Sequence, residues 1–209
     1  DVQNFGADGV TVHPRPDERH IRYNDVIEIR RIIKNEFNIE GYPSPNFLEL
    51  IRNVKPHQVT LVPDPPDAIT SNSGWDTITH QSFLQDVISE LKEHGIRTSI
   101  FIDTNPELVE NAAKTNTDRI ELYTEPYASQ YAQDREKAIA PFVEAANIAH
   151  KEGLNINAGH DLNLENLKFF NEQIPFIKEV SIGHALISDA LYYGLERTIS
   201  MYKELLIKE

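Results

Sequence analysis

Short apolar runs alternate with longer amphipathic segments along this chain of 209 residues. The runs are rich in β-branched residues and end at glycine or proline, as buried strands do. The longer segments repeat apolar residues every three or four positions, which is typical of helices with one buried face. Strands are predicted at residues 8–12, 37–42, 59–63, 96–103, 118–123, 154–160 and 179–184. Helices are predicted from Asn24 or Asp25 to about Glu36, after Ser44, at 79–94, 106–114, 134–152 and 163–171, and from Ile187 to the end.

Strict alternation of strand and helix predicts a parallel sheet with helical crossovers. Each unit takes about 20 to 40 residues, and no Gly-x-Gly-x-x-Gly turn is present, so an α/β (β/α)8 TIM barrel is favoured over an open doubly wound sheet. We expect one barrel domain over residues 1–209. Residues 1–9 have the composition of a helix tail that closes on a glycine. The first strand-helix unit is therefore expected to be largely missing, which would make the domain N-terminally incomplete.

Charge and composition limit the kind of partner. The net charge is −13, which disfavours general binding to nucleic acid or to anionic membranes. No apolar run approaches the roughly 20 residues of a membrane span. The absence of cysteine excludes disulfides and thiolate chemistry and fits a cytoplasmic location. We expect a small-molecule partner. If that partner is a phosphate, the positively charged residues that bind it have to be grouped at one site, because the chain as a whole is acidic.

The densest collection of reactive side chains follows the first predicted strand. His13 ends that strand, because Pro14 and Pro16 cannot continue a ladder of backbone hydrogen bonds. The residues from Arg15 to His20 add two arginines, two carboxylates and a second histidine. Such a loop is suited to bind an anion and to move protons, although charged, proline-rich loops are more often solvated connections.

Other predicted strands also end on titratable residues. Parallel barrel strands bring their carboxyl ends to one face, so residues distant in sequence are expected to meet there. Histidines beside carboxylates are suited to proton transfer with a carbonyl substrate, and no strand-end lysine is present to form a Schiff base. One strand-end histidine is usually structural, whereas three favour a functional cluster. The strand-end residues are His13, Glu40, Asp103, Glu121, His160 and His184.

Two glycine turns near the end of the chain are suited to phosphate binding. Gly159-His160 and Gly183-His184 follow the last two strands, where barrels commonly bind phosphate. The alternative is that the turns simply require glycine. With Arg15 and His20 on another side, two anion sites are expected, as a pair of phosphorylated substrates would need.

Two polar segments are candidate lids, residues 64–75 and 125–133. The first contains hydroxyl and amide side chains, among them Thr70, that suit a polyol or a phosphate. Zinc is the main competing ligand, because three histidines and two glutamates could bind it. No His-x-His or His-Glu-x-x-His spacing is present, however, so no metal site is expected.

Together, several motifs resemble the pyridoxine 5′-phosphate synthase family (PdxJ-type), in order and over essentially the whole chain. The resemblance implies a transferase of vitamin B6 biosynthesis that condenses 1-deoxy-D-xylulose 5-phosphate with 3-amino-2-oxopropyl phosphate. The products would be pyridoxine 5′-phosphate, inorganic phosphate and water, with no cofactor. Family members are homo-octamers built from dimers. The motifs are Gly6–Ile21, Asn38–Glu40, Leu61–Pro63, Ile120–Leu122, Asn157–His160 and Ile182–Ala185.

The resemblance also implies a role for each candidate site residue. His13 and Glu40 would be general bases, and His160 would donate or relay a proton. Glu121 would stabilise a cationic intermediate. The two phosphorylated substrates would be held by Arg15, His20 and Thr70 on one side, and by Asp161, Gly183 and His184 on the other.

Besides the family's first strand, which is expected to be missing here, the chain departs from the family pattern at two places. Asp161 stands where glycine is common, and its carboxylate would repel a phosphate if it faced inward. Tyr123-Thr124-Glu125 replaces the more usual His-Thr-Gly. Other readings stay open: a different phosphosugar isomerase or aldolase barrel, a metal-dependent hydrolase, or a non-catalytic phosphate-binding barrel.

Overall fold

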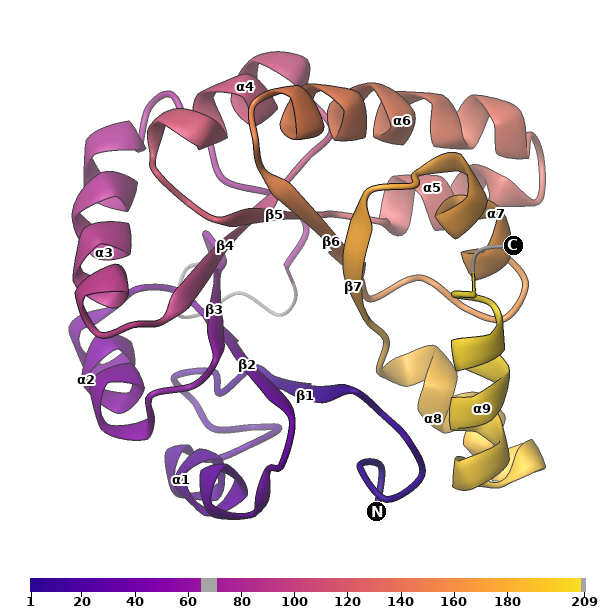
Figure 1. Ribbon diagram of the computed structural model, residues 1–209, viewed down its shortest axis with the longest axis horizontal. Helices are drawn as coiled ribbons and strands as arrows, with labels where there is room; N and C mark the ends of the chain where they lie inside the picture. The colour runs from indigo at the N-terminus through magenta and orange to yellow at the C-terminus, as the bar shows by residue number, and fades with distance from the viewer. Residues whose placement is uncertain (65–70, 208–209) are drawn as a thin grey trace.

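The computed structural model describes residues 1–64 and 71–207. Within them, seven parallel strands form one sheet in sequence order, and this sheet curves into a nearly closed barrel with helices around it (Figure 1). The strands are β1 Gly9–Val12, β2 Glu36–Gly41, β3 Gln58–Leu61, β4 Arg97–Ile102, β5 Arg119–Leu122, β6 Asn155–Gly159 and β7 Ile177–Ser181. The helices are α1 Tyr23–Ile32, α2 Pro45–Val54, α3 Gln81–Glu93, α4 Pro106–Lys114, α5 Glu125–Tyr131, α6 Arg135–Lys151, α7 Leu167–Gln173, α8 His184–Tyr193 and α9 Leu195–Glu204.

Apolar side chains on the outer face of the sheet form the core with the helices. One cluster joins β2, β3 and β4 to α1, α2 and α3, with Phe37 and Phe47 buried in it. A second cluster lies under α4 to α7 and includes Phe142 and Phe170. Each such side chain contributes about 1.5–3 kcal/mol by leaving water. The core therefore lies between the sheet and the helices, rather than inside the barrel.

The barrel interior is largely polar, which is unusual because branched apolar residues generally fill it. Alternate strand residues point inward, and several of these are amides or hydroxyls. Asn38 donates to the Thr60 hydroxyl at 3.1 Å, and the Thr11 and Ser181 hydroxyl oxygens are 3.1 Å apart. The first of these contacts joins the neighbouring strands β2 and β3, and the second links β1 with β7, which are not adjacent in the sheet.

Helix starts agree well with the sequence. The Ser44 hydroxyl accepts from the Phe47 amide at 3.3 Å and caps α2, and proline opens both α2 and α4. The predicted helix at 106–114 has the observed bounds of α4. These elements are well predicted because a cap and a first-turn proline act locally.

Three predicted helices have different bounds. The first ends at Ile32, and Glu36 instead begins β2, where its carboxylate pairs with Arg97. The closing helix is divided into α8 and α9 at Gly194, whose φ is 81°. The helix predicted at 163–171 is α7, Leu167–Gln173, because the Asn163 side chain accepts from two backbone amides and holds the preceding residues in a turn.

The segment 125–133, predicted to be a loop and a candidate lid, contains helix α5. Its Tyr127 is fully buried, and the phenol donates to the Asn166 carbonyl at 2.7 Å. The expected loop is therefore a helix with one side chain in the core, and the candidate lid at 125–133 stays a prediction.

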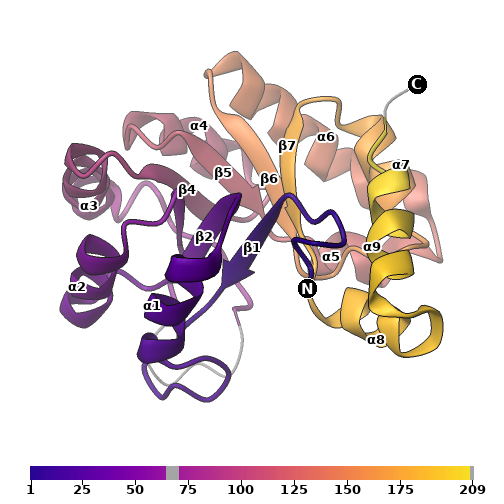
Figure 2. The same cartoon turned by 60° about the horizontal axis from the view of Figure 1, so that its bottom comes forward.

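The barrel is open between β1 and β7, which do not pair with each other in the described part of the chain. Residues of these two strands are only partly buried, whereas β3 is entirely buried. The N-terminal residues lie beside α9, where Lys203 donates to the Gly6 carbonyl at 2.7 Å (Figure 2). An eighth strand-helix unit stays a prediction.

Candidate active site

Four candidate residues lie at the carboxyl ends of strands on one face of the barrel. His13 follows β1, Glu40 lies in β2, Glu121 lies in β5 and His160 follows β6. The His13 Nδ1 atom is 3.7 Å from Glu40 Oε2. A Cβ atom added at Gly159 would lie 3.1 Å from Glu121 Oε1, so the end of β6 packs directly against that carboxyl group.

Glu40 and Glu121 are buried, with exposed fractions of 3% and 1%. Burial, with help from Glu179 and Asp64, raises the pKa of Glu40 to about 7. Burial, and then the neighbouring Glu40, raises the pKa of Glu121 to about 8. Among the described residues, neither Oε1 atom has a hydrogen-bond partner. Near neutral pH these carboxyl groups are therefore able to donate as well as to accept a proton.

His13 has the opposite shift. Burial, followed by the charges of Arg15 and His160, lowers the pKa of His13 to about 3. The imidazole is therefore neutral at physiological pH, and its contact with Glu40 is not an ion pair although the distance would allow one. The neutral imidazole has a free nitrogen lone pair, but a pKa this low makes it a weak base until a neighbouring negative charge, such as the ionised form of Glu40, raises its proton affinity.

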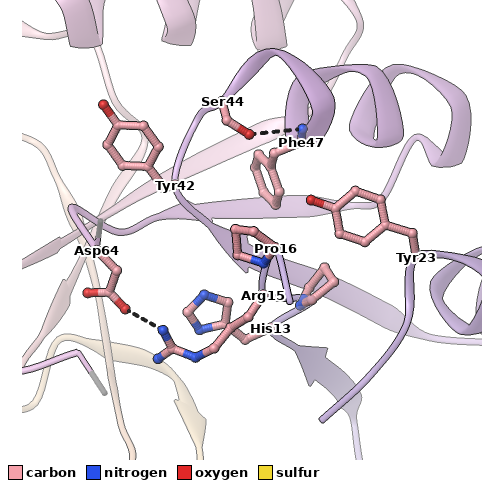
Figure 3. A pocket seen from close by; sticks show the side chains of 9 residues that line it. His13, Arg15, Pro16, Tyr23, Tyr42, Ser44, Phe47 and Asp64 are labelled. Carbon is pink, nitrogen blue, oxygen red and sulfur yellow. Dashed lines mark hydrogen bonds and ion pairs between the residues drawn. The ribbon is translucent and has the colours of Figure 1, made fainter. Parts of the chain in front are cut away.

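Arg15 is the buried cation of this face. Its Nη1 atom lies 3.2 Å from Asp64 Oδ2, and both side chains border a cavity of about 30 Å³ beside His13 (Figure 3). The same Asp64 oxygen accepts from the Ser71 hydroxyl at 2.5 Å. The carboxylate thus connects the loop after β1 to the loop after β3.

His20 and Thr70 were expected to hold a phosphorylated substrate together with Arg15, and the structure describes only the first of them. His20 is exposed in the loop after β1, and its charge is one of the causes that lower the pKa of His13. Thr70 lies outside the described residues.

The last strand leads into a helix start that is open to solvent. Gly183 precedes α8, His184 is its first residue, and both are exposed. No atom lies within 4 Å of the position that a Cβ at Gly183 would take. The first amides of a helix are unpaired and favour an anion, so this end of α8 is suited to a phosphate.

Asp161 is partly buried, and burial raises its pKa. Its Oδ2 atom is 3.5 Å from the Thr124 hydroxyl, and His160 and His184 are close enough to influence it electrostatically. Asp103, which was expected on the same rim, accepts from the Gly74 amide at 3.0 Å instead and so holds the loop after β3.

Three residues near the site were given no role there from the sequence: Asp64, Thr124 and Glu179. Glu179 points into the barrel, with Oε2 2.8 Å from Arg119 Nη1. Its alternation with Ser181 along β7 is a signal that could have placed it inside. The partner of Asp64 lies in another loop, and no local pattern indicates it.

The acidic and histidine side chains of this face do not form a metal site in the described part of the chain. Within residues 1–64 and 71–207, no three histidine, aspartate or glutamate side chains converge closely enough to hold a metal ion. The same ranges contain no helix long and apolar enough to cross a bilayer.

Solved structures support the fold. Phosphoribosyl anthranilate isomerase from Thermotoga maritima superposes with a TM-score of 0.63 at 15% identity, covering 98% of this chain and 90% of that one. 3-Keto-L-gulonate-6-phosphate decarboxylase from Vibrio cholerae gives a TM-score of 0.70 at 11% identity, covering 98% and 87%. At such identities the likeness shows the barrel fold alone.

The sequence comparisons are more specific. The family model described as "Pyridoxal phosphate biosynthesis protein PdxJ" matches residues 1–208. A pyridoxine 5′-phosphate synthase from Bacteroides thetaiotaomicron is 62% identical, over 99% of this chain and 87% of the relative. Another from Parabacteroides distasonis is 63% identical, over 97% and 85%. With a family match over nearly every residue and relatives this similar, the chain belongs to the PdxJ family of pyridoxal phosphate biosynthesis proteins.

Proposed function

We propose that this protein is a pyridoxine 5′-phosphate synthase, a transferase that condenses 1-deoxy-D-xylulose 5-phosphate with 3-amino-2-oxopropyl phosphate. The observation that carries the proposal is the cluster of the partly buried His13 with the buried Glu40 and Glu121 at the barrel mouth, in a chain 62% identical to a curated synthase. The products would be pyridoxine 5′-phosphate, inorganic phosphate and water, without a cofactor.

The chemistry needs several proton transfers, and the cluster is suited to them. The amine of one substrate attacks the ketone of the other, so the Schiff base forms between the substrates and requires no protein lysine. His13 acts as a general base when the Glu40 carboxylate, 3.7 Å from its Nδ1 atom, is ionised and raises the proton affinity of the imidazole. Glu40, whose pKa is raised to about 7 by burial, has the proton affinity that a general base near neutral pH requires. His160, exposed at the mouth, donates or relays a proton to a leaving group.

Glu121 stabilises the positive charge that develops when water leaves the carbinolamine and the protonated Schiff base forms. Burial raises the pKa of Glu121 to about 8, so the group is mostly uncharged at neutral pH. A cationic intermediate beside it favours the carboxylate and lowers that pKa. The charge therefore appears on Glu121 only when the intermediate is there to pair with it.

The two phosphates bind on opposite sides of this cluster. Arg15, together with His20 and Thr70, holds the deoxyxylulose phosphate. The start of α8 at Gly183 and His184 holds the other phosphate, with the backbone at Asp161. The support is the burial of Arg15 beside His13 and the open, unpaired amides of α8.

Turnover with both substrates in the full-length protein tests the proposal, with pyridoxine 5′-phosphate as the product measured. Release of phosphate without ring formation would favour a different phosphosugar enzyme. Binding of both substrates without product would favour a non-catalytic phosphate-binding barrel. Stoichiometric zinc that activity requires would favour a metal-dependent hydrolase.

We further propose that the protein is cytoplasmic and assembles as a homo-octamer built from dimers. An apolar surface on α8 supports self-association: Ile187, Leu191 and Tyr192 are 55%, 82% and 84% exposed, and apolar surface of this kind marks interaction sites. Light scattering of the full-length protein tests the assembly. A monomer at micromolar concentration would contradict it.

A further inference from the structure

Thr124 lies just after β5, beneath the turn that carries His160. Its side chain is 1% exposed, so it cannot reach a substrate. The hydroxyl donates to the Gly159 carbonyl and accepts from the Asp161 amide at 3.3 Å. One buried oxygen thus holds the peptide groups on both sides of His160.

The turn at His160 has a conformation that needs such support. His160 has a φ of 58°, in the left-handed region that is unfavourable for a residue with a Cβ atom. Its amide donates to the Ser181 carbonyl at 2.9 Å, and the Asp161 amide also approaches the Gly159 carbonyl at 2.9 Å. Strain of this type persists where surrounding contacts fix the backbone.

The turn also sets the distance between His160 and Glu121. At Gly159 a Cβ atom would lie 2.9 Å from the Ser181 carbonyl oxygen and 3.1 Å from Glu121 Oε1. The backbone is therefore packed against the carboxyl group with no spare room. A shift of this turn would move the imidazole relative to Glu121.

We propose that Thr124 is a positioning residue, whose hydroxyl fixes the backbone turn that carries His160 over Glu121. Its kinetic consequence rests on the proposed synthase activity. Within the Tyr-Thr-Glu stretch only the flanking Tyr123 and Glu125 depart from the family pattern, and Thr124 keeps the threonine of the usual His-Thr-Gly.

Three variants in the full-length protein test the proposal. Thr124→Val keeps the shape and removes the hydroxyl, whereas Thr124→Ser keeps the hydroxyl. Thr117→Val is the matched control: Thr117 is also buried, and its hydroxyl donates to the Arg119 carbonyl at 3.1 Å, before β5 rather than at the site. It removes a bond of the same kind far from His160.

Misplacement of a reacting group by about 1 Å can lower a rate by about 100-fold. We therefore expect kcat of Thr124→Val to fall by about 10- to 100-fold while KM for both substrates changes less than about 3-fold. Thr124→Ser and Thr117→Val should retain kcat within about 3-fold. An unchanged kcat in Thr124→Val, or equal losses in the serine and valine variants, would overturn the proposal.

Amide hydrogen exchange gives a second readout that does not depend on turnover. We expect the Asp161 amide to exchange at least about 10-fold faster in Thr124→Val than in Thr117→Val or the wild type. If Thr124→Val does not fold, Thr124→Ala is measured in its place. If the wild type makes no product, the synthase proposal fails, and exchange alone decides the role of Thr124: unchanged exchange at Asp161 overturns it.

Discussion

Replacing Glu121 with glutamine should stabilise the protein at alkaline pH while abolishing most of its turnover. The carboxyl group is fully buried, and one of its oxygens has no partner among the described residues. Glutamine has nearly the same shape, and its carbonyl oxygen can still accept the Thr60 hydroxyl, which lies 3.3 Å from Glu121 Oε2. The variant therefore removes an ionisation and little else.

The magnitude follows from proton linkage. Burial raises the pKa of Glu121 to about 8, from 4.5 for an ordinary glutamate. Between these values the folded state holds a proton that the unfolded state has lost, so the free energy of unfolding decreases as pH rises. From about pH 6 to about pH 9 this one group should lower it by about 3 kcal/mol. The glutamine variant lacks this contribution and should be correspondingly less sensitive to pH.

Urea unfolding at about pH 6 and about pH 9, followed by fluorescence of the single tryptophan, measures the difference. Glu144→Gln, an exposed change on α6, is the matched control and should keep the wild-type pH dependence. If Glu121→Gln and the wild type lose equal stability between the two pH values, Glu121 does not titrate in this range. The argument for a neutral carboxyl at the site would then be refuted.

Further variants separate catalysis, binding and packing. Glu40→Gln and His160→Asn should each lower kcat at least about 100-fold with KM changed less than about 3-fold in steady-state assays, and the reverse pattern would undo these roles. Arg15→Ala should raise KM for the deoxyxylulose phosphate at least about 10-fold and lower kcat less; an unchanged KM would contradict a binding role. Gly159→Ala should lower the free energy of unfolding in urea by about 1–3 kcal/mol, because its Cβ meets Ser181 and Glu121. Gly183→Ala should change this free energy by no more than about 0.5 kcal/mol. It should instead weaken phosphate binding, as measured by calorimetry. Equal stability losses at the two glycines would contradict this assignment.

Much of the fold could be predicted because its signals are local. Proline cannot continue a strand, and β1 and β3 end shortly before Pro14 and Pro63. Pro106 opens helix α4, which has the predicted bounds. The short helix α5 was missed since seven residues with one buried tyrosine give no helical period. Gly194 was missed as a break because the apolar spacing continues on both sides of it.

The candidate site was only partly predictable, for a different physical reason. Strand-end positions give the rim, because parallel strands deliver their carboxyl ends to one face. Side-chain partners across the barrel have no such signal: Glu179 pairs with Arg119 from 60 positions away, and Asp64 reaches Arg15 from another loop. The pKa values of Glu40 and Glu121 depend on burial and on these neighbours, so they follow only from the three-dimensional structure.

The polar barrel interior explains how two buried carboxyl groups can remain at the mouth. Deeper in the barrel, Glu179 is charge-paired with Arg119 at 2.8 Å, so negative charge there is already compensated. At the mouth, Glu40 and Glu121 are close enough to influence each other electrostatically, and within the described part of the chain neither Oε1 atom has a hydrogen-bond partner, so a second negative charge there is opposed by the first. Burying a carboxylate without a partner costs several kcal/mol, which keeps Glu121 mostly protonated at neutral pH until a cationic intermediate lies beside it. Glu40, with a pKa of about 7, is ionised in a large fraction of molecules at neutral pH and can act as the base. The desolvation that opposes charge on Glu121 therefore makes that charge available at the step that needs it.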